Sequence, residues 1–476
     1  MAKYSEELEL SIKDNNLLNY LKDYFDKKEN NSCIVVNNHI DEKNSNITIL
    51  TFNYLDTIRS YDLKIIVNIY LSYLHSLITK IEIIVDDEKI NENDLLLYFL
   101  SFYKECSMNV VNKKSKKYTV RNYYSILHQS GFKGEYIIKL NNTTKVKQLT
   151  NNPYKNVAAE RIVALDCEVD AISLTDARTK SYNITKDIAA FLSVLLNIGF
   201  FEYRSIFSNF VRKVKDTKGI EMLCGEMQRE AFIDDELGLV VRDNMNGLQI
   251  ADDFNKDKRL TYFSFTPLDE NLNVISSFSE NNEFNNNKEL DKIFKDKLKI
   301  TKSKNLQSYY CDDIENHAAA QAELKIPRCI KKYFKSLEEL KKDDEKRYNN
   351  FRNCARLYNL AYTQGIYEPS LMVSYMVSAI EALAKSEKMY FTEFMKKYLE
   401  GEYDKDICDL IYGNIRSGHF HSGEFFFNEY SLNMDIALNH AFEKQMNIFV
   451  KSRVLLRRAI INWIKKELLM KESKQK

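Results

Sequence analysis

Residues 404–423 read Asp-Lys-Asp-Ile-Cys-Asp-Leu-Ile-Tyr-Gly-Asn-Ile-Arg-Ser-Gly-His-Phe-His-Ser-Gly. The apolar residues in the first part of this stretch recur at helical spacing and would lie on one face: Ile407, Leu410, Ile411 and Ile415. We therefore expect an amphipathic helix from about Asp404 to Arg416. Gly418 and Gly423 favour an irregular connection to the next helix, because glycine adopts backbone conformations that other residues avoid.

Helical periodicity extends outward from this stretch over the last third of the chain, and strand signals vanish after about residue 310. One helix is expected over about 331–364, with a break near Asp343. A second begins after Pro369, and a long final helix covers about 434–470. Together these segments predict a bundle of four or five helices.

The first 300 residues have a mixed pattern. Short runs rich in β-branched residues predict strands, for example at 33–36, 47–52, 81–85, 136–140, 239–241 and 260–265. Helical patterns lie between them at 58–78, 92–105 and 184–200. The predicted fold class is therefore α+β, with a mixed α/β region followed by an all-α bundle.

A polar stretch from Ser277 to about Lys304 marks the predicted boundary between two domains, residues 1–300 and residues 310–476. A weaker break near Asn151-Asn-Pro153 indicates a sub-boundary. The length of 476 residues fits two or three domains, and a content of only 12 glycines and 4 prolines favours helix.

Composition narrows the function classes. The net charge of +1 provides no global attraction to nucleic acid, and the eight cysteines include no Cys-x-x-Cys pair, which argues against a zinc ribbon or a disulfide scaffold. The N-terminus has no apolar signal region, and no apolar run reaches the length of a membrane span. We expect a cytoplasmic protein with no membrane partner.

The pair Arg416 and His421 is the one place where chemistry can be named from the sequence. Histidine transfers protons near neutral pH, and arginine is a planar donor suited to phosphate oxygens. In a straight α-helix, residues five apart point about 140° away from each other. We expect Gly418 to release the chain from helical geometry, so that both side chains converge on one phosphate. The pair then suits RNA cleavage through the ribose 2′-hydroxyl, without metal or cofactor, leaving 2′,3′-cyclic phosphate ends.

With its helical context, this stretch resembles the HEPN superfamily, whose ribonucleases carry an arginine, four to six residues and a histidine. The segment Ile411–Gly423 and the preceding Ala379-Ile-Glu-Ala-Leu383 look most like the Apea-like branch. The resemblance covers roughly residues 330–470. It implies a homodimer or higher oligomer in which two motifs form one composite ribonuclease site.

The resemblance also assigns residue roles. Arg416 and His421 would be catalytic, with the polar Ser417 supporting their geometry. Glu381 would orient Arg416, unless it is an exposed helix carboxylate, and His419 would assist, unless it is a loop histidine without a role. In function, the resemblance implies a bacterial antiphage toxin acting by abortive infection, with an unknown activating ligand or phage component at the N-terminal region.

The C-terminal segment 441–476 carries ten Lys and Arg against three Glu. We expect RNA-backbone contacts from Lys451, Arg453, Arg457 and Arg458, because phosphates attract clustered cations. The alternative is a solvated helix face.

Asp166 and Glu168, in the run Arg161-Ile-Val-Ala-Leu-Asp-Cys-Glu-Val-Asp170, form a rival site. A strand ending in Asp-x-Glu resembles the first motif of two-metal exonucleases, although the later motifs are missing. The alternative is a strand edge with solvated acids. No phosphate loop, dinucleotide fingerprint or His-Glu-x-x-His occurs. The functional alternatives to a defence nuclease are a non-catalytic HEPN scaffold that binds RNA or protein, and a housekeeping RNA-processing nuclease.

Overall fold

The structure is a computed structural model, and it describes most of the chain in segments. These are residues 2–11, 35–41, 44–72, 77–112, 115–128, 135–139, 142–148, 160–172, 174–204, 207–215, 221–245, 248–250, 260–268, 310–311, 324, 326–327, 329–365, 367–431 and 440–470. They fall into two compact units. The first comprises Met1–Lys116 and Ala171–Asp176, and the second comprises Lys117–Asp170 and Ala177–Lys476.

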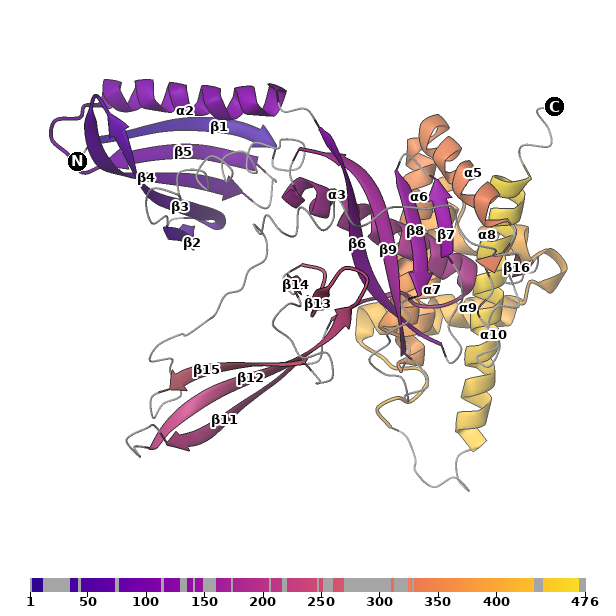
Figure 1. The fold of residues 1–476 in the computed structure, drawn as a ribbon. Helices are drawn as coiled ribbons and strands as arrows, with labels where there is room; N and C mark the ends of the chain where they lie inside the picture. Colours follow the sequence, from indigo (N-terminus) through magenta and orange to yellow (C-terminus); the bar gives the residue numbers. More distant parts are fainter. Residues whose placement is uncertain are drawn as a thin grey trace. The chain divides into compact units, whose positions relative to one another are not determined.

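The first unit is an antiparallel sheet with one helix on it (Figure 1). Its strands are β1 (Ala2–Ser11), β2 (Val35–Asp41), β3 (Asn44–Ile58), β4 (Tyr61–Ser72) and β5 (Leu77–Val85), in the order β1-β5-β4-β3-β2. Alternate residues of β4, such as Ile65, Val67 and Ile69, are buried, as expected for one covered face. The helix α2 (Glu92–Asn112) adds Leu95 and Phe99 to the same core.

The helix predicted over 58–78 is wrong. Residues Asn44–Ile58 and Tyr61–Ser72 form a hairpin, in which Ile58 pairs with Tyr61. Arg59 and Ser60 between them have φ of 50° and 70°, as a tight hairpin turn of this length requires. Neither residue is the glycine, asparagine or aspartate that such a turn favours, so the turn gave no signal, whereas the β-branched content of β4 favours a strand.

The second unit begins with a five-stranded sheet in the order β10-β6-β9-β8-β7. Its strands are β6 (Lys116–Leu127), β7 (Glu135–Lys139), β8 (Thr143–Gln148), β9 (Glu160–Ala171) and β10 (Phe201–Glu202). Helix α3 (Leu174–Leu196) leads from β9 to β10, and its residues Phe191 and Leu195 are buried with the C-terminal helices. The sheet, α3 and those helices therefore share one core.

A second sheet of this unit contains β11 (Phe207–Lys215), β12 (Glu221–Asp234), β13 (Leu239–Val241) and β14 (Leu248–Ile250), with β15 (Leu260–Leu268) also paired to β12. Two short strands, β16 (Tyr310–Cys311) and β17 (Ile326–Pro327), pair in parallel. The boundary predicted within 277–304 and the weaker one near 151–153 lie outside the described residues. The predicted division into 1–300 and 310–476 differs from the two units, because β6–β10 and α3 share their core with the C-terminal helices.

Helices then follow one another to the end of the described chain. They are α5 (Ile330–Asp343), α6 (Glu345–Thr363), α7 (Pro369–Ser386), α8 (Phe391–Leu399), η4 (Glu400–Glu402), α9 (Lys405–Asp409), η5 (Leu410–Ser422), α10 (His440–Trp463) and η7 (Ile464–Leu469). The predicted break near Asp343 is confirmed: Asp344 ends α5 and its side chain accepts the N–H of Arg347 at 2.9 Å, which caps α6. The α+β class, with strands first and helices last, is confirmed.

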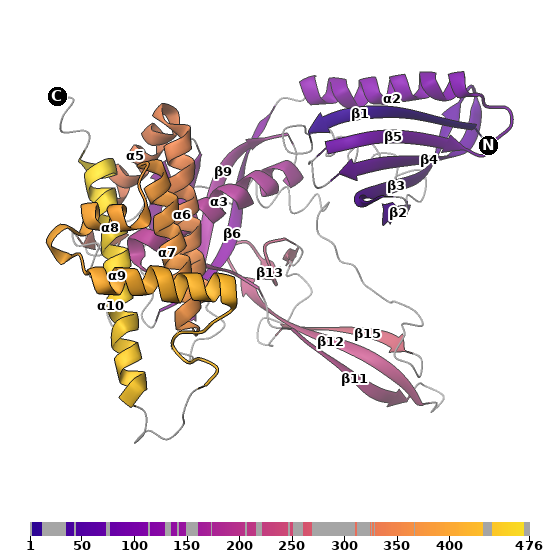
Figure 2. The same ribbon diagram turned by 180° about the vertical axis from the view of Figure 1, so that it is seen from behind.

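Helix α9 and its continuation η5 lie across α7 (Figure 2). The side chains of Ile411 and Ile415 are buried in this contact, and the Ser374 hydroxyl of α7 lies 3.5 Å from the Ile415 carbonyl oxygen. The apolar face recognised in the sequence therefore serves to fix one side of η5 against the bundle core.

Candidate active site

The segment that carries Arg416 and His421 is a π-helix. Asp404 caps α9 by accepting the N–H of Ile407 at 3.1 Å, and from Leu410 onward the hydrogen bonds run between residues five apart. Such helices are rare and occur frequently at functional sites. The π-helix ends where Gly423 adopts φ of 68°, with its N–H bound to the His419 carbonyl at 3.1 Å.

The π-helical turn brings the two predicted catalytic residues together. Because residue i+5 lies one turn above residue i in this helix, Arg416 and His421 lie on neighbouring turns of one face. Arg416 Nη1 lies 3.4 Å from His421 Nε2. The expected convergence is present, but its cause differs from the prediction. Gly418 does not break the helix, and the helix continues through it in a wider form.

Glu381 of α7 holds the guanidinium from another side. Its Oε2 lies 3.0 Å from Arg416 Nη2, and both side chains are about three-quarters buried. The rings of Tyr412 and Phe420 lie within 6 Å of the Arg416 guanidinium carbon, at 5.9 and 5.8 Å. Arg416 Nε is buried and makes no hydrogen bond to any described residue. The guanidinium is therefore fixed in orientation while keeping donor capacity.

His421 is exposed beside this guanidinium. A guanidinium can only donate hydrogen bonds, so the contact at 3.4 Å fits a neutral imidazole whose Nε2 accepts. In that form the one basic lone pair of the ring is on Nε2, so the atom that can take a proton is the atom beside the guanidinium. The arrangement thus pairs a solvent-accessible proton acceptor with a fixed cation, which is the chemistry that phosphoryl transfer from a hydroxyl requires.

Two further predicted residues lie close by without joining the pair. Ser417 is half-buried on η5, and its hydroxyl has no hydrogen bond to a described residue. His419 Nδ1 lies 3.3 Å from the Glu424 carbonyl, and its ring packs edge-on against Phe425 at 5.1 Å. His419 therefore lies within η5 rather than in a loop, and its side chain faces the turn that ends the helix.

Aromatic residues around the pair went unnoticed in the sequence. Phe420 is 43% exposed, and it packs against Tyr375 of α7 at 5.8 Å between ring centroids. Tyr412 stacks on Phe391 at 5.0 Å. The available signal was spacing, because Tyr412 and Phe420 lie four residues before and after Arg416, a separation at which helical side chains meet.

The four basic residues expected to contact RNA on α10 are in different environments. Arg457 is only 6% exposed, and its Nη1 donates to the Val194 carbonyl at 2.8 Å. This corrects the expectation for Arg457, because its charge satisfies carbonyls at the end of α3 rather than facing solvent. Lys451 pairs with Asp404 at 2.6 Å and Arg458 pairs with Glu402. Arg453 lies over the ring of Tyr362.

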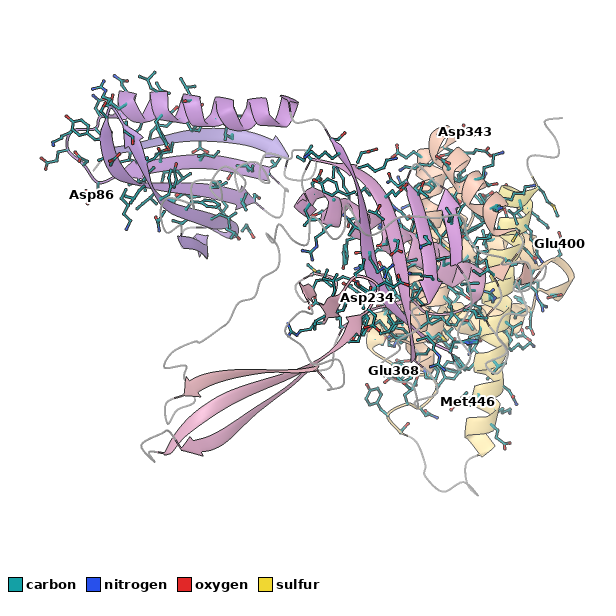
Figure 3. The ribbon with its side chains drawn as sticks, in the orientation of Figure 1. Asp86, Asp234, Asp343, Glu368, Glu400 and Met446 are labelled. Carbon is teal, nitrogen blue, oxygen red and sulfur yellow. The ribbon has the colours of Figure 1, made fainter. Side chains whose placement is uncertain are left out.

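The rival residues Asp166 and Glu168 both lie on β9 but differ in burial, since Glu168 is only half-buried. Asp166 is fully buried, and its carboxylate receives two hydrogen bonds from Arg121, at 2.6 and 2.9 Å. Arg121 also binds Asp234 at 2.8 Å and Glu236 at 2.9 Å (Figure 3 labels Asp234). Burial alone would lower the pKa of Arg121, but the carboxylates of Asp166 and Asp234 outweigh it and raise that pKa. Asp166 is therefore part of a buried ion network, which explains its place on β9 without a metal.

In the part of the chain that the structure describes, no cluster of three or more His, Cys, Asp or Glu is placed to hold a metal ion. Among the same residues, no helix combines the length and apolarity needed to cross a membrane. Comparison of the chain with protein-family models, curated proteins and solved structures found no match.

Proposed function

We propose that this chain is a metal-independent endoribonuclease that cleaves RNA by attack of the ribose 2′-hydroxyl. The observation that carries the proposal is the contact between Arg416 Nη1 and His421 Nε2, at 3.4 Å, on one face of a π-helix. The resemblance to HEPN ribonucleases names the same two residues. Their proximity gives that resemblance a physical basis within one chain.

In the proposed reaction, His421 is the general base and Arg416 stabilises the charge on the phosphate. The imidazole of His421 removes the proton from the 2′-hydroxyl, which then attacks the adjacent phosphorus. Arg416 donates to the phosphoryl oxygens, on which negative charge increases in the transition state. Glu381, 3.0 Å from Nη2, restrains the guanidinium so that no reorganisation is needed during the reaction. The products are a 2′,3′-cyclic phosphate and a 5′-hydroxyl.

A second copy of the chain completes the site. The departing 5′-oxygen needs a proton while the 2′-hydroxyl loses one, and a single imidazole cannot serve both at once. His419 is turned toward Glu424, so within one chain only His421 stands beside the arginine. A two-fold dimer would place a second His421 opposite the first, and the exposed Phe420 and Tyr412 rings would lie at its edge.

The biological part of the proposal is a regulated bacterial antiphage effector, in which a ligand or phage component acts through the N-terminal region. Its support is the HEPN resemblance. Growth arrest on expression, lost in the Arg416→Ala variant, is the expected observation. Normal growth of cells that contain active enzyme would favour a housekeeping nuclease.

Cleavage of a labelled oligoribonucleotide in excess EDTA tests the chemistry. We expect full activity in EDTA, 2′,3′-cyclic phosphate ends, and no cleavage at a position carrying 2′-O-methyl. Loss of activity in EDTA would contradict the proposal because it requires a metal ion, and cleavage at the 2′-O-methyl position would contradict it because it requires another nucleophile. No cleavage by a folded dimer would favour the non-catalytic scaffold.

A further inference from the structure

A second candidate site lies on α10, at a pocket of about 240 Å³. It is bounded by α10, the end of α6 and the residue that follows α3. Its lining residues are Asn197, Tyr362, Val450, Arg453, Val454, Arg457 and Arg458. Three of these are arginines and none is an acid, so the pocket has a clear electrostatic preference for an anion.

The arginines differ in how much of their charge is already used. Arg457 donates to backbone carbonyls of α3 and to the Tyr358 hydroxyl at 2.9 Å. It therefore adds positive charge to the pocket, while its donors are bound to groups of the protein. Arg458 pairs with Glu402, which does not line the pocket. Arg453 has no carboxylate partner among the described residues: its Nη2 donates only to the Tyr362 hydroxyl, at 3.4 Å, and its buried Nε makes no hydrogen bond to any of them. Arg453 is therefore the cation with most capacity for a ligand.

The pocket offers donors rather than acceptors. Guanidinium groups only donate. Asn197 Oδ1 already accepts from the hydroxyls of Tyr358 and Tyr362, at 2.6 and 2.5 Å, which leaves its amide N–H groups for another partner. A ligand rich in acceptor oxygens, such as a phosphate monoester, satisfies such a lining, and the planar arginine fork matches phosphate geometry.

An apolar edge adjoins these donors. Val450 and Val454 lie one helical turn apart on α10 and are 52% and 46% exposed. Valines beside arginines at an open pocket favour a ligand that carries an apolar or flat group as well as a charge. The volume is below the roughly 300–1,000 Å³ of pockets for drug-sized ligands, which limits the occupant to one phosphate and one ring system.

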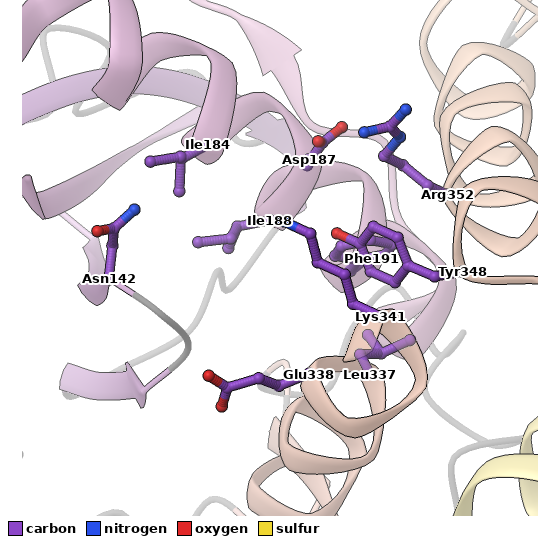
Figure 4. A pocket seen from close by; sticks show the side chains of 10 residues that line it. All are labelled: Asn142, Ile184, Asp187, Ile188, Phe191, Leu337, Glu338, Lys341, Tyr348 and Arg352. Carbon is purple, nitrogen blue, oxygen red and sulfur yellow. The ribbon is translucent and has the colours of Figure 1, made fainter. Parts of the chain in front are cut away.

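Another pocket, of about 140 Å³, lacks this preference (Figure 4). Its floor is apolar, but its rim carries the acids Asp187 and Glu338 together with the bases Lys341 and Arg352. Because this pocket carries equal numbers of acidic and basic side chains, it favours neither anions nor cations. The α10 pocket is therefore the stronger candidate for a ligand site.

We infer that the α10 pocket binds a nucleoside monophosphate, with the phosphate at Arg453 and Arg458 and the base against the exposed side chains of Val450 and Val454. The Tyr362 ring is not available to the base, because it stacks on Tyr358 at 4.9 Å and the Arg453 guanidinium lies over it. The ligand chemistry is a terminal nucleoside phosphate, whether free in solution or at the 5′ end of an RNA strand. This inference goes beyond RNA cleavage and does not depend on Arg416 or His421.

Calorimetric titration of the full chain tests it, with adenosine 5′-monophosphate, adenosine and inorganic phosphate as probes. We expect the monophosphate to bind at least about tenfold more tightly than adenosine or phosphate alone. Arg453→Met should weaken it at least about tenfold, with partial rescue in Arg453→Lys. Lys451→Met is the matched control, because Lys451 lies on the same helix but pairs with Asp404 and does not line the pocket.

Val454→Asp is a second variant that tests phosphate binding, and it replaces Arg453→Met if that variant does not fold. This position is 46% exposed, so the fold should survive, and the added carboxylate should repel the phosphate. Comparing a 5′-phosphorylated with a 5′-hydroxyl 2′-O-methyl trinucleotide separates the sources. Tighter binding of the phosphorylated trinucleotide than of the monophosphate identifies a strand end, and weaker binding identifies a free nucleotide. Binding that is absent, is equal for adenosine, or is unchanged in both variants overturns the inference.

Discussion

Arg121 and Arg416 both pair with carboxylates. Their surroundings differ, and the difference indicates that Arg121 stabilises the fold whereas Arg416 is able to bind a ligand. Arg121 has a fully buried side chain and binds Asp166, Asp234 and Glu236. Arg416 has one carboxylate partner, a buried Nε without a partner among the described residues, and an exposed histidine at 3.4 Å. An arginine saturated by buried acids holds strands together. An arginine restrained on one side and open on the other can bind a substrate anion.

The largest expected effect comes from breaking the saturated arginine. Arg121→Met leaves Asp234 buried without its cation and Asp166 with only Lys145, at 3.9 Å, which should cost about 3–5 kcal/mol in the free energy of unfolding. Urea unfolding followed by circular dichroism measures it. Arg356→Met is the matched control: Arg356 is half exposed and pairs with Asp187 at 2.6 Å, so its loss should stay within about 1 kcal/mol. Equal losses of unfolding free energy in the two variants would mean that the buried Arg121 network stabilises the fold no more than an exposed ion pair does.

Substitution of Arg416 should have the opposite effect, with a large change in the rate of RNA cleavage and a small change in stability. Arg416→Lys keeps the charge but loses the fork that reaches Glu381 and the substrate together, so the rate of RNA cleavage should fall about 10²-fold. The unfolding free energy should change by less than about 1 kcal/mol, because the pair is partly exposed. Activity assays and urea unfolding on the same preparation make the comparison. A stable, fully active lysine variant would show that bidentate geometry at this position is not needed.

The smallest effect on stability and activity is expected at Gly418. The sequence predicts that this glycine breaks the helix and so brings Arg416 and His421 together, whereas in the structure a continuous π-helix does so. A Cβ at Gly418 would meet only the movable Glu424 carboxylate, at 3.0 Å. Gly418→Ala should therefore change stability by no more than about 1 kcal/mol and activity less than about threefold, since alanine favours helix. Gly423→Ala is the control, because φ of 68° strains any other residue there. Abolished cleavage in folded Gly418→Ala would restore the glycine-hinge explanation.

The sequence predicts local features well where the signal is local. The break at Asp343 and the start of α7 at Pro369 follow from capping and proline geometry, and both are observed. Helix α8 was not predicted, and β4 was predicted as a helix. In β4, apolar residues on both faces imitate helical periodicity, and the turn at Arg59-Ser60 lacks glycine or asparagine.

The candidate site was predictable in its residues but not in its geometry. Arg416, His421 and Glu381 follow from spacing and resemblance, and the structure brings all three together. A π-helix has no composition signal of its own, so the reason for their convergence could not be read from the sequence. The environment of Asp166 was equally inaccessible, because Arg121 and Asp234 lie 45 and 68 residues away along the chain and meet it only in the folded protein.

The most direct measurement compares RNA cleavage by the purified His421→Ala and His419→Ala proteins in EDTA, both checked for an unchanged melting temperature. The two histidines are two residues apart on η5, but only His421 contacts Arg416. We expect His421→Ala to lose activity by about 10²–10⁴-fold, as removal of a general base does, and His419→Ala to change it less than about threefold. Cleavage by His421→Ala at the rate of the unmodified protein would contradict the assignment of the active site.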